Sequence, residues 1–145
     1  MEWNEINTAW GEATLLLSRL SDEMKITFPK YRLIPLSNVS KVTCLLKPFR
    51  QYDLHGNATS CQTKDSFFNC GMVAWLQCLS YFVQWAERQD SKIRLPYAIN
   101  EECIGTLSIR YYGEQNGENW TKACKFVLTN LKWMLAWCFK RQRMK

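Results

Sequence analysis

Cysteine and histidine side chains are the residues of this sequence that could bind a metal. The chain has 145 residues with seven cysteines and one histidine, His55. The cysteines are widely spaced and form no C-x-x-C pair, and a single histidine adds only one further ligand. We therefore expect reduced structural thiols, no metal site and no cofactor. The cysteines are Cys44, Cys61, Cys70, Cys78, Cys103, Cys124 and Cys138.

The same residues offer no recognisable catalytic arrangement. An enzyme would need a nucleophile beside a base, paired carboxylates or a metal cluster, and none of these has a recognisable spacing here. His55 lies in a polar segment, so a cysteine–histidine hydrolase built on it has little support. A glycine-rich phosphate-binding loop is also absent from the sequence. We predict that the chain is not an enzyme and has no catalytic residues.

The charge of the chain favours anionic partners. Its net charge is +6 and its pI is about 9.0, which suits acidic lipid headgroups, nucleic acid or an acidic protein surface. The C-terminal basic residues fit either a lipid-contacting patch or a solvated helix end, where cations offset the helix dipole. Nucleic acid is disfavoured because the tryptophans recur at helical spacing among Leu and Met, as core residues do. The C-terminal basic residues are Lys140, Arg141, Arg143 and Lys145.

Three amphipathic helices are expected from apolar residues that recur at steps of three and four. They cover residues 4–25, 65–89 and 116–140, with Asn4, Asp65 and Asn116 as N-terminal caps. The third is apolar nearly all round and should be covered on most sides. The residues predicted to pack in the core are Trp10, Leu17, Trp75, Leu79, Phe126, Leu131 and Leu135.

Short strands are expected between the helices, over residues 26–64 and 92–112. β-branched and aromatic residues favour strands in the first region, and apolar residues alternate in Ile93–Ile99 and Leu107–Tyr111 in the second. The order helix, strands, helix, strands, helix predicts one mixed α/β (α+β) domain with two small antiparallel sheets. No signal peptide is recognisable, and the longest apolar stretch, Phe126–Phe139, is shorter than the roughly 20 residues of a membrane span, so we expect a cytoplasmic chain.

The chain resembles the beclin family in that family's evolutionarily conserved C-terminal domain. The resemblance covers almost the whole chain in family order. It is carried by Trp3-Asn4-Glu5-Ile6-Asn7, Ala9-Trp10-Gly11, Met72-Val73-Ala74, Leu95-Pro96-Tyr97, Trp120-Thr121-Lys122-Ala123 and Leu128-Thr129-Asn130-Leu131-Lys132-Trp133. Departures at Met134, Cys138 and the C-terminal tail indicate a divergent paralogue or retrocopy, such as the family's second paralogue.

The resemblance implies sheet-plus-helix repeats about a pseudo-threefold axis. It also implies a non-catalytic scaffold in autophagy and endosomal trafficking, with the catalytic and regulatory subunits of the class III phosphatidylinositol 3-kinase complex as partners. The domain would bind anionic membranes weakly and would be peripheral to endosomal or autophagosomal membranes. The alternative is an inert truncated fragment that lacks the family's lipid-binding and assembly segments.

The family's membrane-contacting aromatic finger aligns with residues that are not aromatic. The predicted membrane-contact residues are Gln62, Thr63 and Lys64, the neighbouring Phe67, and Lys140, Arg141 and Arg143. The sequence given also starts at the first helix, so we expect a domain without the family's first sheet. We therefore expect apolar residues of that helix to be partly uncovered and to favour self-association. These residues are Ile6, Trp10, Leu17 and Leu20.

Overall fold

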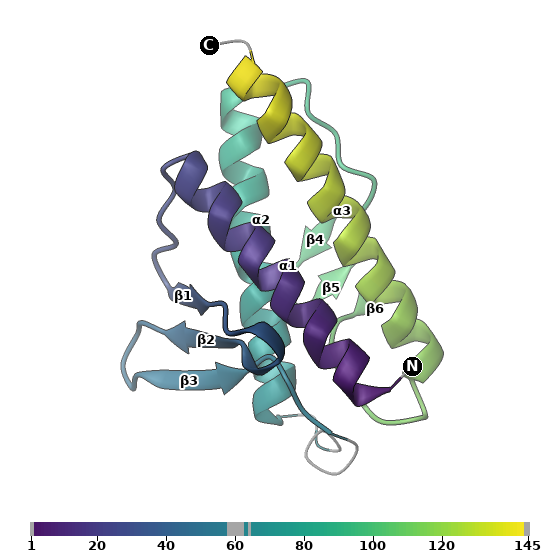
Figure 1. Ribbon diagram of the computed structural model, residues 1–145. Helices are drawn as coiled ribbons and strands as arrows, with labels where there is room; N and C mark the ends of the chain where they lie inside the picture. Colours follow the sequence, from purple (N-terminus) through teal and green to yellow (C-terminus); the bar gives the residue numbers. More distant parts are fainter. Residues whose placement is uncertain (1, 58–62, 64, 144–145) are drawn as a thin grey trace.

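The computed structural model describes residues 2–57, 63 and 65–143 and contains three long helices in this part of the chain. They are α1 (Trp3–Glu23), α2 (Phe67–Gln89) and α3 (Gly117–Arg143). α1 and α3 lie in front of α2 in Figure 1, with one small sheet beside α1 and α2 and a second behind α3. The predicted mixed α+β class with three helices and two small antiparallel sheets is confirmed.

The first sheet is an antiparallel meander that packs on α2. Its strands are β1 (Tyr31–Ile34), β2 (Lys41–Cys44) and β3 (Arg50–Asp53), with the 3-10 helix η1 (Ser37–Val39) between β1 and β2. Leu33 pairs with Val42 and both are buried, so the sheet turns these side chains toward the core. The small sheet of short strands predicted in residues 26–64 is thus confirmed.

The second sheet is shorter than the sequence predicted. It has three two-residue strands, β4 (Ile99–Asn100), β5 (Cys103–Ile104) and β6 (Leu107–Ser108). The predicted strand over Ile93–Ile99 is therefore wrong for most of its length. Its alternating residues do pack inward, but the backbone of Tyr97 is hydrogen-bonded to a side chain and not to a partner strand.

Three asparagines, one on each helix, hold distant backbone segments in the same way. In each case the side-chain amide donates to the carbonyl of one residue and accepts from the N–H of that same residue. Asn7 binds Gly56, Asn69 binds Tyr111 and Asn130 binds Tyr97, at donor–acceptor distances of 2.7–3.3 Å. This recurring arrangement is the clearest repeated feature of the fold, and sequence periodicity could not show it.

The core lies between the helices and the sheets. Trp10, Leu17, Trp75, Leu79 and Leu131 are buried, whereas Phe126 is half-buried and stacks on Tyr97. The prediction is wrong for Leu135, which lies at the surface with an exposed fraction of 36%. α3 is also less covered than its sequence indicated. Its exposed large apolar residues are Leu128, Trp133, Leu135 and Phe139.

The predicted exposure of the first helix is wrong. Ile6, Trp10, Leu17 and Leu20 are all buried, because α1 packs on the first sheet, on α2 and on α3. None of the helices in the described part of the chain combines the length and the hydropathy that a membrane span requires.

The predicted helix caps differ in detail from those in the structure. α1 has Glu2 at its N-cap position and not Asn4. Ser66, and not Asp65, caps α2 by accepting a hydrogen bond from the Asn69 N–H. Asn116 precedes α3, but its side chain accepts from the Tyr112 N–H and donates to the Arg110 carbonyl.

Candidate functional site

The first group of predicted membrane-contact residues precedes α2. Gln62 and Lys64 lie outside the described residues. The carbonyl of Thr63 accepts hydrogen bonds from Asn69 Nδ2 at 3.0 Å and from the Ser66 N–H at 3.2 Å. Since Asn69 is also bound to Tyr111, Thr63 is tied to the first turn of α2 and, through it, to the segment that follows the second sheet.

Phe67 is the first residue of α2 and has an exposed fraction of 57%. Its ring makes an edge contact with Tyr52 of β3, with the ring centroids 6.1 Å apart. The next residue, Phe68, is buried and packs edge to face against Trp3 and Trp120. One aromatic ring therefore remains available at the surface at the start of α2, and its neighbour belongs to the core.

The second predicted group is the last turn of α3. Lys140 and Arg143 are exposed, whereas the guanidinium of Arg141 lies 5.0 Å from the ring centroid of Trp137. Trp137 Nε1 in turn donates to Asp90 Oδ2 at 3.1 Å. The Lys92 N–H bonded to Oδ1, and next the Trp137 bond, hold the pKa of Asp90 below its ordinary value. Trp137 therefore links α3 to the residue that follows α2, and Arg141 packs on the ring that makes this link.

The two predicted groups do not lie together. Phe67 begins α2, and Asp90, which binds Trp137, directly follows its last residue. A helix of 23 residues is about 35 Å long at 1.5 Å per residue. Figure 1 shows the start of α2 and the C-terminal end of α3 at opposite ends of the molecule. The predicted contact residues therefore form two separate surfaces, and not one.

A further exposed apolar surface was missed by the sequence reasoning. It is the turn of residues 45–49 between β2 and β3, where Leu45, Leu46 and Phe49 are exposed. The signal for it in the sequence is the run Leu45-Leu46-Lys47-Pro48-Phe49, because a turn between two strands is ordinarily polar.

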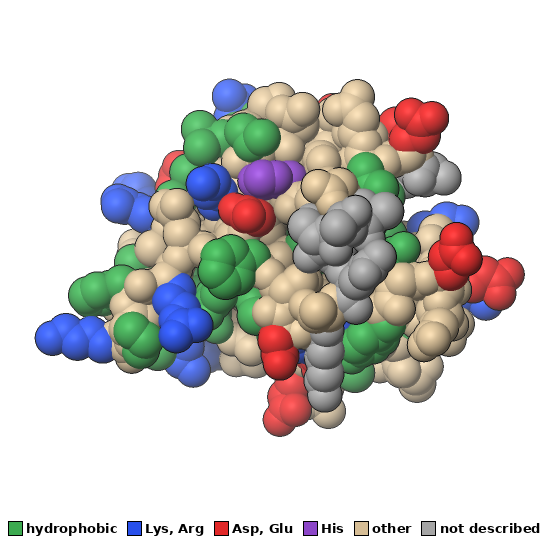
Figure 2. Space-filling view, turned by 90° about the horizontal axis from the view of Figure 1, so that it is seen from below, with side chains coloured by type: hydrophobic (Ala, Val, Ile, Leu, Met, Phe, Trp, Pro, Cys, Tyr) green, Lys and Arg blue, Asp and Glu red, His purple; other side chains and the backbone are tan. Residues whose placement is uncertain are grey.

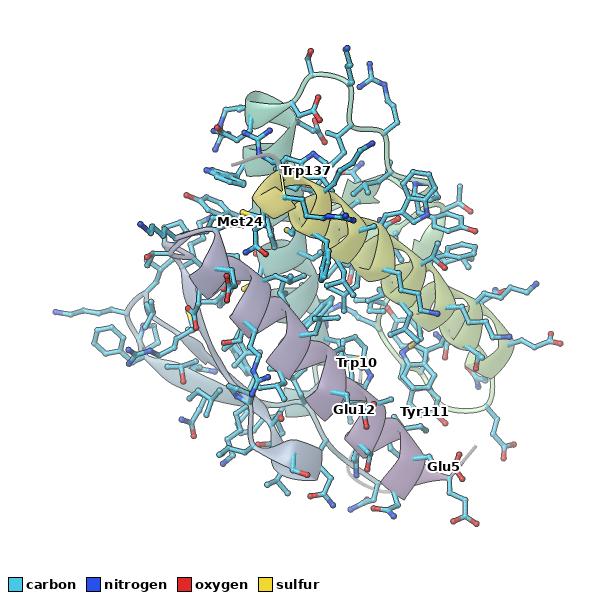
Figure 3. All side chains as sticks on the ribbon, turned by 45° about the horizontal axis from the view of Figure 1, so that its top comes forward. Glu5, Trp10, Glu12, Met24, Tyr111 and Trp137 are labelled. Carbon is cyan, nitrogen blue, oxygen red and sulfur yellow. The ribbon has the colours of Figure 1, made fainter. Side chains whose placement is uncertain are left out.

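An apolar groove of about 340 Å³ lies between parts of α1 and α3. Trp3, Trp10, Tyr111, Trp120 and Leu128 are among the residues that line it. Figure 3 shows Trp10 of α1 and Tyr111 in the space between the two helices. Trp120 Nε1 is buried and has no hydrogen-bond acceptor in the described part of the chain. The groove is thus apolar, and the unsatisfied donor of Trp120 is buried within its lining residue.

Three of the cysteines have thiols that are shielded from solvent. Burial raises the pKa of the Cys78 and Cys124 thiols to about 12 and that of Cys138 to about 11, which keeps them protonated and unreactive at neutral pH. His55 Nε2 lies 3.5 Å from Asp53 Oδ1. No group of three or more His, Cys, Asp or Glu residues that could hold a metal ion occurs among the residues that the structure describes.

Comparison with known proteins shows which family the sequence matches. Residues 1–140 match the sequence profile of the Apg6 BARA domain. The chain is 39% identical to a Beclin-1-like protein of Drosophila melanogaster and 38% identical to Beclin-1 of Xenopus tropicalis, each over 94% of the chain. It is 36% identical to human Beclin-2 over 96% of the chain, so these identities do not single out a paralogue. The chain spans about a third of the length of these curated relatives.

Proposed function

This chain belongs to the beclin family through its BARA domain, and on that premise we propose that it is a non-catalytic scaffold module acting in autophagy and endosomal trafficking. Its partners would be the catalytic and regulatory subunits of the class III phosphatidylinositol 3-kinase complex. The observation that carries the proposal is the match over residues 1–140, which covers all three helices and both sheets almost completely.

Membrane engagement is the second part of the proposal. The chain would act as a peripheral module at endosomal or autophagosomal membranes, held weakly by electrostatic attraction to anionic lipids. The net charge of +6 and the exposed Phe139 beside the exposed Lys140 in the last turn of α3 support it. A basic residue near such a surface contributes about 1 kcal/mol, and salt weakens this attraction.

We also propose that the chain is not an enzyme. The sequence has no recognisable catalytic arrangement, and the surroundings of its thiols agree with this. The buried thiols are held protonated, and His55 faces Asp53 at 3.5 Å. Thiols that stay protonated at neutral pH are poor nucleophiles, which supports the proposal.

Co-purification with the kinase subunits tests the scaffold proposal. The tagged chain is expressed with the catalytic and regulatory subunits, and recovery of the subunits with the tag is measured. We expect recovery above that of an unrelated tagged domain. Circular dichroism of the same preparation must show a folded helical protein. A folded chain that recovers neither subunit would be the inert fragment and would contradict the proposal.

A further inference from the structure

The turn of residues 45–49 presents apolar side chains to solvent at the margin of the molecule. Leu45, Leu46 and Phe49 have exposed fractions of 40%, 52% and 65%. Figure 1 shows this turn between β2 and β3 at the left edge, away from the three helices. Exposed leucines are ordinary when they are scattered singly, but here three large apolar residues occupy one five-residue turn.

The turn stands on a rigid base. The Leu45 N–H donates to the Lys30 carbonyl at 2.8 Å, and Cys44, the last residue before the turn, pairs with both Tyr31 and Arg50. Tyr31 Oη donates to Gln77 of α2 at 3.1 Å, which fixes this end of the sheet to the helix. The apolar side chains are therefore held outward by an ordered sheet, so that presenting them to a partner requires little ordering of the backbone.

The charge around the turn has one sign. Residues 30–51 contain no Asp or Glu, and they contain five basic residues, Lys30, Arg32, Lys41, Lys47 and Arg50. Lys47 and Arg50 are exposed within and directly after the apolar run. Figure 2, which views the molecule from below, shows hydrophobic side chains interspersed with Lys and Arg at the left edge, where this sheet lies.

We propose that the turn of residues 45–49 is a membrane-insertion element, with Leu45, Leu46 and Phe49 entering the interface of an anionic bilayer while Lys47 and Arg50 contact its headgroups. Apolar residues flanked by Lys and Arg suit such an interface, because the headgroup region solvates the cations while the acyl boundary accepts the apolar groups.

A lipid surface fits the turn better than a protein partner does. A stable protein interface buries at least about 1,000 Å² in total, whereas three side chains on a protruding turn present only a small area. A bilayer needs no matching pocket and accepts such a protrusion anywhere on its surface. An acidic protein would satisfy the charges but would leave a convex apolar tip without a hydrophobic partner.

This inference rests on the proposed membrane engagement and assigns it to a surface that differs from the two predicted from the sequence. Phe67 lies at the start of α2 and Lys140 in the last turn of α3, whereas the turn projects from the outer edge of the first sheet. It needs no contact with the kinase subunits, so its failure and that of the scaffold proposal can be told apart.

Co-sedimentation of the full chain with lipid vesicles tests the proposal. The vesicles contain phosphatidylcholine and phosphatidylserine in equal parts, and pure phosphatidylcholine vesicles report the contribution of lipid charge. Leu46→Ser is compared with Leu36→Ser, because Leu36 has a similar exposed fraction of 49% and precedes η1 at the other end of β1. Lys47→Gln is compared with Lys122→Gln, an exposed position on α3.

We expect Leu46→Ser to weaken binding to the mixed vesicles at least about tenfold, and Leu36→Ser to leave it unchanged. The leucine effect should persist in high salt. Lys47→Gln should weaken binding about fivefold in low salt only, and Lys122→Gln should change it little.

Equal vesicle binding by Leu46→Ser and Leu36→Ser would overturn the proposal, as would Lys47→Gln and Lys122→Gln having equal effects. Loss of self-association in Leu46→Ser with unchanged vesicle binding would also overturn it and would assign the turn to contact with a second copy. Circular dichroism confirms that each variant is folded. Recovery of the kinase subunits by Leu46→Ser separates a failure at the membrane from a failure of the scaffold proposal.

Discussion

Single side chains hold together segments that are far apart in this sequence. Asn69 and Tyr111 are 42 residues apart, and Trp137 binds Asp90 across 47 residues. Neither pairing follows from periodicity or composition, because a polar residue on a helix is ordinarily solvated. Asn69 and Asn130 are fully buried. Buried polar groups are ordinarily hydrogen-bonded, and these two side chains meet that requirement by binding distant backbone segments.

Acidification should weaken the contact between the ends of α2 and α3. The pKa of Asp90 is held below its ordinary value of 3.8 by the Lys92 and Trp137 hydrogen bonds. A depressed folded-state pKa stabilises the protein above the unfolded-state value, and this contribution is lost as pH falls through the folded-state value. We therefore expect Asp90→Asn to unfold at a lower temperature than the wild type near neutral pH, and the difference to shrink as pH falls below 3.8.

Thermal unfolding followed by circular dichroism over this pH range measures the effect. Trp137→Phe serves as the comparison, because it removes one of the two hydrogen-bond donors to Asp90 and leaves the Lys92 N–H in place. Trp137→Phe should also lower the unfolding temperature, and its difference from the wild type should vary less with pH than that of Asp90→Asn. Parallel curves for Asp90→Asn and the wild type at every pH would contradict the assignment.

The helices of this fold could be predicted from the sequence, and the strands only in part. α1, α2 and α3 begin and end close to the predicted residues because their apolar stripes recur over many turns. The alternation in Ile93–Ile99 predicted that Leu95 and Tyr97 pack inward. It did not predict that the backbone of Tyr97 is hydrogen-bonded to the side chain of Asn130 in place of a neighbouring strand. Alignment predicted membrane contact near Phe67, and the charge pattern predicted it at Lys140, but neither shows that these two residues lie at opposite ends of the molecule.

Two glycines allow η1 and β3 to approach α1 and α2 closely. A side-chain carbon at Gly11 of α1 would overlap the Ser37 carbonyl of η1, and one at Gly71 of α2 would lie 2.5 Å from the Asp53 carbonyl of β3. In both cases the obstructing atoms belong to the backbone, so they cannot rotate away. Glycine is required there by close packing and not by backbone conformation.

Gly11→Ala should destabilise the protein by about 1–3 kcal/mol, because the helix and η1 must move apart to admit the methyl group. Gly117→Ala is the control, since a carbon there meets no atom within 4 Å. That change should be neutral or slightly stabilising, as alanine favours helix more than glycine does. Urea unfolding gives both free energies. A stabilised Gly11→Ala would show that α1 and η1 do not pack as closely as in this structure.

At the scale of the whole molecule, the fold covers its core and leaves a groove open. The predicted loss of cover over α1 is wrong, because Ile6, Trp10, Leu17 and Leu20 are buried where α1 packs on the first sheet, η1, α2 and α3. The open apolar surface lies instead between α1 and α3, where Leu128 is exposed at the rim and the buried Trp120 Nε1 has no acceptor in the described part of the chain.

The groove should be the place where an additional segment of polypeptide stabilises this module. A segment that covered it would bury the apolar surface of the groove, and an uncovered apolar patch is ordinarily an interface or an aggregation liability. We expect the chain to bind a hydrophobic dye, and Leu128→Glu to reduce this binding more than Leu46→Ser does.

Extending the chain upstream with the corresponding segment of a beclin relative should lower dye binding, reduce any self-association measured by sedimentation, and raise the unfolding temperature. Leu128→Glu should then weaken the stabilisation that the extension provides, because it places a charge at the rim of the covered groove. A chain that is monomeric, binds no dye and gains no stability from the extension would show that the groove between α1 and α3 needs no cover, and that the three helices and two sheets form a complete core.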